Sequence, residues 1–328
     1  MPAPSVFCTR PFLAGKRQLL TNLCKTSVDF KQCRNMRLLR FQGPTGPRLA
    51  AERKDGHVVD LNACAELELT TPGDTIEFLT AGPALWETAE RSVKSGKHAL
   101  RVNDKCYLAP LLKSDKVIGV CSNYADHCVE LGVPVPVEPV LFSKFSSCLV
   151  GPTSSIHSSS ETQTLDWEVE LAVVIGKQGK NIVERKAMSH VFGYTVAHDV
   201  SERTWQLQKN SGQFLIGKAM DSFCPIGPVI VSKDEIADPH NLTLRTKVNG
   251  ILKQDSNTSQ LVHRIPALIT FISRFFTLLP GDIILTGTPP GVGCFMKPPQ
   301  YLKEGDVVEC EVEGIGCIRN AVRRPDAA

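Results

Sequence analysis

The sequence lacks the features that mark nucleic-acid-binding and membrane proteins. Its 328 residues carry a formal net charge of only +3, which is too little to predict a basic surface for a phosphate backbone. No run approaches the roughly 18 uninterrupted apolar residues that a membrane span needs. The nearest, residues 265–279, is interrupted by Pro266, Ser273 and Arg274. We therefore expect neither a nucleic acid nor a membrane as a partner.

The cysteines lack the spacing of a zinc site or a disulfide framework. The chain has 12 of them, and none forms a Cys-x-x-Cys pair. A chain of this length, with 42% hydrophobic residues, can build a core without covalent cross-links. We interpret the cysteines as reduced thiols, most of which fill small positions in the core.

Acidic residues are scarce at the start of the chain. Up to position 40 there are eight lysines and arginines but one acid, Asp29, and serine and threonine are frequent. The apolar segment of a secretory signal is missing as well. This composition is typical of a mitochondrial transit peptide, so we predict one over residues 1–35 and a location in the mitochondrial matrix. A disordered basic tail is the alternative.

Residues 36–110 show secondary-structure signals but no candidate chemistry. Residues 50–61 predict two short strands around a Lys-Asp-Gly turn. Residues 83–93 predict a helix, with a proline at its start and a glycine shortly after its end. We expect this stretch to form a small α+β subdomain that leads into a main body over residues 111–322.

The main body is organised around residues 166–176, which alternate between charged and apolar side chains and then become continuously apolar. This pattern predicts a strand whose second half is buried on both faces. Alternate side chains of a strand share a face, so Glu168 and Glu170 should project side by side, with Asp166 one step earlier. Adjacent carboxylates repel each other unless a cation lies between them. A solvated edge of alternating charge is the alternative.

A second apolar strand, over residues 191–200, ends in Asp199. We expect this strand to lie beside the first and to bring a third carboxylate to the two glutamates. Three carboxylates without a Cys/His cluster predict a hard cation that prefers oxygen ligands. The expected ion is Mg²⁺ or Mn²⁺, with Ca²⁺ as an alternative.

Other polar residues predict a general base and a binding site for an anion. A helix over residues 124–131 would place His127 and Glu130 on one face, as a general base and its orienter. An ordinary surface ion pair is the alternative. Lys144 and Lys218 each follow an apolar run, where a lysine either reaches water or faces an anionic ligand. The Gly/Thr/Pro-rich loop over residues 286–293 can offer N–H groups to an anion.

Four motifs occur in order along the main body: Asn-Tyr-Ala-Asp-His at 123–127, Asp-Trp-Glu-Val-Glu-Leu at 166–171, His-Asp-Val-Ser-Glu-Arg at 198–203 and Thr-Gly-Thr-Pro-Pro-Gly-Val-Gly at 286–293. Together they resemble the fumarylacetoacetate hydrolase family. The resemblance implies a mixed β-sandwich roll of the α+β class, with a small N-terminal α+β subdomain. It also implies a homodimer with the active site near the interface.

The resemblance also implies roles for individual residues. The family's metal ligands match Glu168, Glu170 and Asp199. Its water-activating pair matches His127 and Glu130, and its residues that face the substrate match Arg203, Gln206, Lys218 and Thr288. We expect either Lys218 or this pair to shuttle the proton, and Lys144 to bind substrate. Thr204 stands where relatives often have aspartate, which bears on how Arg203 is held.

The substrates that the resemblance implies are 2-oxo acids and β-dicarbonyl compounds. A divalent cation would stabilise the enolate to which all these reactions lead. The resemblance suggests an isomerase, an oxaloacetate keto–enol tautomerase. Acylpyruvate hydrolase and oxaloacetate decarboxylase are the alternatives, because their reactions involve the same enolate and differ in the bond that is formed or broken. A non-catalytic keto-acid-binding protein is the alternative of a different class, and the combined presence of a base, lysine and arginine argues against it.

Overall fold

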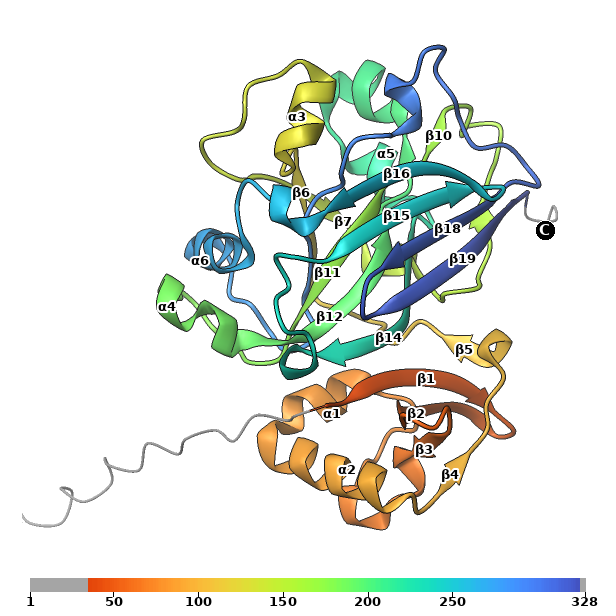
Figure 1. The fold of residues 1–328 in the computed structure, drawn as a ribbon, viewed down its shortest axis with the longest axis vertical. Coiled ribbons are helices and arrows are strands. Elements are labelled where there is room, and N and C mark those ends of the chain that lie inside the picture. Colours follow the sequence, from red (N-terminus) through yellow and green to blue (C-terminus); the bar gives the residue numbers. More distant parts are fainter. Residues whose placement is uncertain (1–34, 325–328) are drawn as a thin grey trace, which may run out of the picture. The chain divides into compact units, whose positions relative to one another are not determined.

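The computed structural model describes residues 35–324 (Figure 1). The predicted transit peptide lies outside the described residues, apart from its last position. No helix within the described range is long and apolar enough to cross a membrane. The architecture is α+β, with two large β-sheets and short helices around them.

The N-terminal elements, drawn in red and orange, build the first part of the larger sheet (Figure 1). They are β1 (Arg37–Gly43), β2 (Gly46–Glu52), β3 (Val58–Asp60), α1 (Thr75–Ala81), α2 (Pro83–Ser95), β4 (Ala99–Leu100) and β5 (Tyr107–Leu108). Asp74 caps α1 by accepting from the Ile76 N–H at 2.8 Å, and α2 ends at Gly96, whose φ is 70°. The strands predicted over 50–61 and the helix predicted over 83–93 are confirmed.

The larger sheet has the strand order β4-β3-β2-β1-β14-β12-β11-β17-β6-β7. Its remaining strands are β6 (Val117–Cys121), β7 (Val140–Lys144), β8 (Leu149–Val150), β11 (Val169–Ile175), β12 (Val191–His198), β14 (Cys224–Ser232) and β17 (Ile283–Leu285). The sheet is mixed, because β17 pairs in parallel with β6 while β11 pairs antiparallel with β12. The pairing of β1 with β14 carries the sheet across residue 110, and a domain boundary at that residue stays a prediction.

The second sheet has the order β16-β15-β18-β19-β9 and packs against β11 and β12, which makes the sandwich. Its strands are β9 (Ile156–His157), β15 (Thr243–Val248), β16 (Ile251–Asn257), β18 (Val307–Val312) and β19 (Gly316–Arg323). Apolar side chains of β11, all seven of whose residues are buried, fill the space between the sheets. β11 therefore occupies the centre of the fold: it pairs along its whole length with β12 on one side and over residues 172–174 with β17 on the other.

Short elements surround the end of β11 at which the acidic residues lie. They are α3 (Ala125–Leu131), β10 (Leu165–Asp166), β13 (Ser201–Glu202), a π-helical turn over Thr204–Gln208 and α5 (Leu215–Ala219). Two further helices, α4 (Glu184–Ala187) and α6 (Ile265–Phe275), pack against each other at the far end of β11 and β12. In Figure 1, α3 and α5 lie on the same side of the sandwich as β10.

Candidate active site

Three carboxylates meet at the start of β11. Glu168 immediately precedes the strand, Glu170 lies on it, and Asp199 directly follows β12. The two strands pair antiparallel, and the Asp199 N–H donates to the Glu168 carbonyl at 2.9 Å. The three residues are buried, and each offers an oxygen within 4.8 Å of the others. The structure thus brings together the acids that the two strand patterns pointed to.

Lysines neutralise two of these carboxylates. Lys218 Nζ donates to Glu168 Oε2 at 2.9 Å and to Asp199 Oδ2 at 2.6 Å. Burial raises the pKa of Glu168, but Lys218 and then Arg203 outweigh it and lower that pKa to about 2. Burial likewise favours neutral Lys218, yet Asp199 and Glu168 hold its pKa above the ordinary value. At neutral pH both members of the Glu168–Lys218 pair are therefore ionised.

Glu170 has a different environment. Its Oε2 accepts from the Gly287 N–H at 2.5 Å, and no cationic side chain of the described range forms an ion pair with it. Burial, followed by the charges of Asp199 and Glu168, raises its pKa well above the ordinary value. An oxygen-only set with one uncompensated carboxylate suits a divalent cation of the hard class. The residues therefore fit such an ion.

Asp166 does not join this cluster, although we expected it on the same face. The predicted strand is interrupted: β10 ends at Asp166 and β11 begins only at Val169. Asp166 Oδ2 accepts from Arg203 Nε at 2.8 Å, and its Oδ1 accepts from the Gly293 N–H at 2.7 Å. Asp166 therefore anchors Arg203 and the nearby loop.

Arg203 retains an unused donor. Its Nε is held by Asp166, and its Nη1 lies 2.7 Å from Glu168 Oε1 and 2.8 Å from Gln206 Oε1. Its buried Nη2 has no hydrogen-bond partner among the described residues. A buried guanidinium N–H without a partner is unfavourable unless a ligand accepts from it, and Arg203 lines the cavity of this site. The Thr204 hydroxyl forms a hydrogen bond with the Thr164 hydroxyl at 3.0 Å. Arg203 is therefore anchored by Asp166 and not by Thr204.

The helix α3 presents His127, paired with Glu130, to the same cavity. His127 Nδ1 lies 2.8 Å from Glu130 Oε2, which confirms the predicted i,i+3 contact. Glu130 Oε1 accepts from the Gly291 N–H at 2.8 Å, so the carboxylate is bound on both sides. His127 is 8% exposed and lines the cavity. Because Nδ1 is engaged with Glu130, the other ring nitrogen is available for proton transfer.

Thr288 and Lys144 are placed differently from what a direct substrate contact suggests. The Thr288 hydroxyl donates to the Val169 carbonyl at 2.9 Å, so its proton is already used. Lys144 Nζ is fully buried and donates to Asp199 Oδ1 at 2.6 Å and to the carbonyl of Lys218. Thr288 lines the cavity, whereas Lys144 does not. Lys144 thus supports Asp199 from behind.

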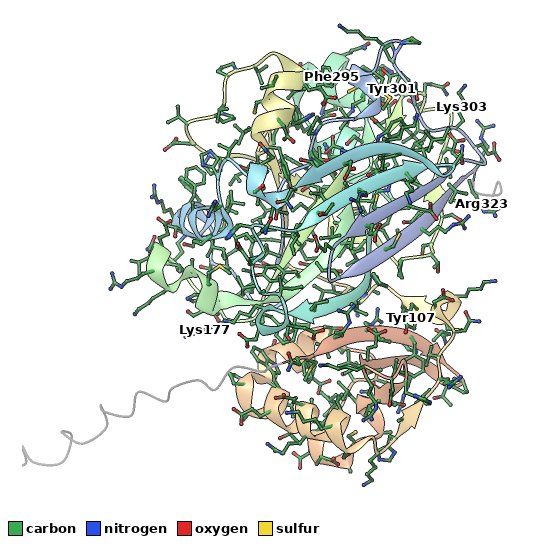
Figure 2. All side chains as sticks on the ribbon, viewed as in Figure 1. Tyr107, Lys177, Phe295, Tyr301, Lys303 and Arg323 are labelled. Atoms are coloured by element: carbon green, nitrogen blue, oxygen red, sulfur yellow. The ribbon has the colours of Figure 1, made fainter. Side chains whose placement is uncertain are left out.

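The cavity itself has a volume of about 110 Å³. Gln206 and Lys218 line it, as predicted. It is also lined by apolar residues that sequence reasoning did not identify, among them Phe142, Phe214 and Phe295. Figure 2 shows Phe295 beside α3, and its ring centroid lies 6.5 Å from that of His127. An aromatic residue after an apolar run carries no signal that separates a pocket side chain from a core side chain.

Gln254 is a further residue that sequence reasoning missed. It lies on β16, is 1% exposed, and its Nε2 donates to the Thr288 hydroxyl at 2.9 Å and to the Pro289 carbonyl at 2.8 Å. Its Oε1 accepts from the Val169 N–H at 3.0 Å. One amide thus joins the second sheet to the loop over 286–293 and to the start of β11. Its only signal is a polar residue at an inward position of a strand.

Comparisons with known proteins agree with this geometry. The family profile described as Fumarylacetoacetate (FAA) hydrolase C-terminal matches residues 116–323. The chain is 52% identical over 312 residues to "Oxaloacetate tautomerase FAHD2A, mitochondrial" of Bos taurus, covering 94% of this chain and 98% of that protein. The Homo sapiens protein of the same name is 48% identical over 314 residues, covering 94% and 99%.

A solved structure supports the fold. The fumarylacetoacetate hydrolase from Exiguobacterium antarcticum matches with a TM-score of 0.76 and 37% identity, over 88% of this chain and 100% of that one. The chain belongs to the fumarylacetoacetate hydrolase family, and its mixed sandwich is the fold of that family. The family and the fold expected from the four motifs are confirmed.

Proposed function

We propose that this protein is an oxaloacetate keto–enol tautomerase that depends on a divalent cation. One observation carries the proposal: a single small cavity is lined by Glu168 and Glu170 of a buried acidic cluster, by an arginine with an unused donor and by His127, which is paired with a glutamate. The names of the close relatives supply the substrate. Mg²⁺ or Mn²⁺ is the proposed ion, with Ca²⁺ as the alternative, and its ligands are Glu168, Glu170 and Asp199.

When bound, the cation would stabilise negative charge on the 2-oxo oxygen and so lower the free energy of the enolate. The chain's own residues position the substrate and move the proton. Arg203 Nη2 is free to donate to the substrate carboxylate, beside Gln206. The Thr288 hydroxyl cannot donate a hydrogen bond to the substrate carboxylate, because its proton is already donated to the Val169 carbonyl. Thr288 therefore offers a carboxylate its backbone N–H.

We assign the proton transfer at C3 to His127. Glu130 holds Nδ1, which leaves the second ring nitrogen to deliver a proton to C3 of the enol or to remove one from the ketone. Lys218 is a poor base, because two carboxylates hold its pKa above the ordinary value. It remains protonated, and its charge favours the anionic substrate.

The test follows the enol of oxaloacetate by its absorbance and pyruvate by a coupled assay, with the cation present. Rapid loss of enol without pyruvate supports the tautomerase. Pyruvate that appears in step with enol loss would favour the decarboxylase. No change in either, together with measurable oxaloacetate binding, would favour the non-catalytic keto-acid-binding protein.

Acylpyruvate hydrolase is a second candidate for a specific reason. The pair of His127 and Glu130 is built like a general base with its orienter, and such a pair can activate water as readily as it protonates carbon. Acetylpyruvate is the substrate that separates the two activities. If His127 acts on water alone, His127→Gln removes its hydrolysis and leaves tautomerisation intact.

The cellular setting and assembly are part of the proposal. The names of the relatives support a mitochondrial location, and the composition of residues 1–35 supports a transit peptide and the matrix. We also propose a homodimer and a catalytic unit over residues 111–322. Light scattering on the purified chain measures its mass, and mass spectrometry of the imported protein locates its N-terminus.

A further inference from the structure

The lining of the cavity is partly polar and partly apolar. Its polar residues include Glu168, Glu170, His127, Arg203, Gln206 and Lys218. Its apolar residues, called here the apolar wall, include Leu131, Phe142, Leu207, Phe214, Val292 and Phe295. A site for a four-carbon dicarboxylate alone has no need of three aromatic rings, because such a substrate offers them almost no apolar surface.

The charges of the cavity serve one carboxylate better than two. Lys218 is committed to Glu168 and Asp199, and Arg203 has a single unused donor, Nη2. The apolar wall contributes no cationic side chain to the cavity. A second carboxylate packed against the apolar wall would lose water without gaining a charged partner among the wall residues, which is unfavourable. An apolar substituent in the same place would be stabilised by burial.

The position of Phe142 is fixed by its neighbour across the strands. Gly119 on β6 pairs with Phe142 on β7, and a Cβ at Gly119 would lie 2.1 Å from the ring atom Cζ of Phe142. The ring therefore lies over the bare backbone of Gly119. From there it faces Lys218 Nζ, at 5.0 Å from the ring centroid, and Phe214, whose centroid is 6.1 Å away. Such an aromatic pair is a stable surface for a third ring.

The apolar wall continues to the mouth of the cavity. Leu207 is 52% exposed and Phe295 is 41% exposed, although both line the site. A substituent that leaves C3 of a bound 2-oxo acid can thus follow the wall toward solvent. The cavity of about 110 Å³ needs to enclose only the 2-oxo acid end of such a ligand.

We propose that the same site interconverts the enol and keto forms of 2-oxo acids that carry an aryl group at C3. This inference rests on the proposed function and widens its substrate class to arylpyruvates. The step needs no co-reactant: the enol O–H gives up its proton, the C2–O bond becomes a carbonyl, and the C2–C3 π electrons form a new C3–H bond. His127 supplies the proton at C3, while Phe142 and Phe214 hold the ring.

The test compares the enols of phenylpyruvate and oxaloacetate with the full chain and Mg²⁺. We expect both to be converted, and Phe142→Leu or Phe214→Leu to lower the ratio of kcat/KM for phenylpyruvate to that for oxaloacetate by about tenfold, mainly through KM. Phe275→Leu is the matched control, because that ring is 59% exposed and lies outside the cavity. The control should leave the ratio unchanged.

The outcomes separate the two proposals. Conversion of oxaloacetate without any acceleration of phenylpyruvate overturns the inference and leaves the proposed function standing. Conversion of phenylpyruvate alone supports the inference and removes oxaloacetate as the substrate. If both are converted but the two variants lower both rates equally, the apolar wall does not hold the ring and the inference is wrong. Thermal melts of each variant exclude unfolding as the cause.

Discussion

The acidic cluster and the histidine–glutamate pair face the same cavity but are held in opposite ways. The cluster lies where β11 begins and β12 ends, and these are two fully buried strands that hydrogen-bond to each other and to further strands on both sides. The pair stands on α3, a helix of seven residues on which Val129 is 81% exposed, and the segment that follows it includes Val137, which is 95% exposed.

The difference teaches which part of the site depends on the whole fold. The strand-borne cluster moves only if the sandwich moves. The helix-borne pair depends on a few side-chain contacts, among them Glu130 with the Gly291 N–H and Ser256 with Asp126 at 2.6 Å. We therefore expect mutations in the cluster to change stability and cation binding, and mutations around α3 to change turnover with little effect on either.

Asp199→Ala should have the largest effect. It removes a proposed cation ligand and leaves Lys144 and Lys218, which contact it at 2.6 Å each, without that partner in the interior. Loss of one member of a buried pair costs about 3–5 kcal/mol. We expect no measurable turnover and a large fall in the free energy of unfolding, measured by urea denaturation. A variant of wild-type stability would contradict this account of Lys144.

His127→Gln should reduce turnover nearly as strongly but leave the cluster intact. Loss of a general acid–base group lowers kcat by about 10²–10⁴-fold. Cation affinity, measured by calorimetry, and the melting temperature should stay near the wild-type values. Glu130→Gln should give a smaller loss of kcat, because the imidazole remains. A parallel loss of cation binding in either variant would show that the two parts of the site are not independent.

Glu170→Gln should separate cation binding from stability. The raised pKa of Glu170 means that folding favours its protonated form, so the cation-free protein should lose stability as pH rises above about 4.5 toward that raised pKa. Without this charge, the EDTA-treated variant should melt a few degrees higher at pH 7 than the EDTA-treated wild type. It should also fail to bind Mg²⁺ in calorimetry. A lower melting temperature would mean that Glu170 is stabilised by a partner.

Glu168 should give the opposite pH response in the same experiment. Its pKa is lowered to about 2 in the folded state, so its contribution is present at neutral pH and lost as pH falls from about 4.5 to about 2. Urea denaturation of Glu168→Gln across this acidic range should show a shallower pH dependence than the wild type. An identical slope would mean that Lys218 does not hold Glu168 ionised.

Ser256→Ala should have the smallest effect and sharpens the account of α3. It removes the hydrogen bond to Asp126, a contact worth about 1 kcal/mol. We expect a fall in kcat of less than tenfold and an unchanged affinity for the cation. Ser259→Ala is the matched control, because Ser259 is exposed on the same segment of chain. If the two variants behave alike, Asp126 does not position α3.

Local patterns predicted much of the site. The alternation at Glu168 and Glu170 and the apolar run before Asp199 pointed to the acidic cluster, and the helical spacing of His127 and Glu130 pointed to the pair. These features depend on neighbours within a few residues. The interruption at Trp167 and Glu168, which turns Asp166 away from the cluster, has no local signal because both halves read as strand.

The rest depends on contacts between distant parts of the chain. Lys144 meets Asp199 across 55 residues, and Gln254 meets Val169 across 85. A lysine after an apolar run looks the same whether it reaches solvent or a buried carboxylate. Likewise, Phe142 becomes part of a cavity only because β7 pairs with β6 in the register that places it over Gly119.

The two lysines beside the cluster also determine whether the cation must bind during folding or can bind after it. Because Lys144 and Lys218 already compensate Asp199 and Glu168, the chain can reach its native structure in the absence of the cation. Loading then becomes a reversible binding step of a finished protein, unlike that of small metal-dependent domains that fold only around their ion. The active fraction would follow the free concentration of the ion, so the supply of the metal could set the activity from minute to minute without new synthesis.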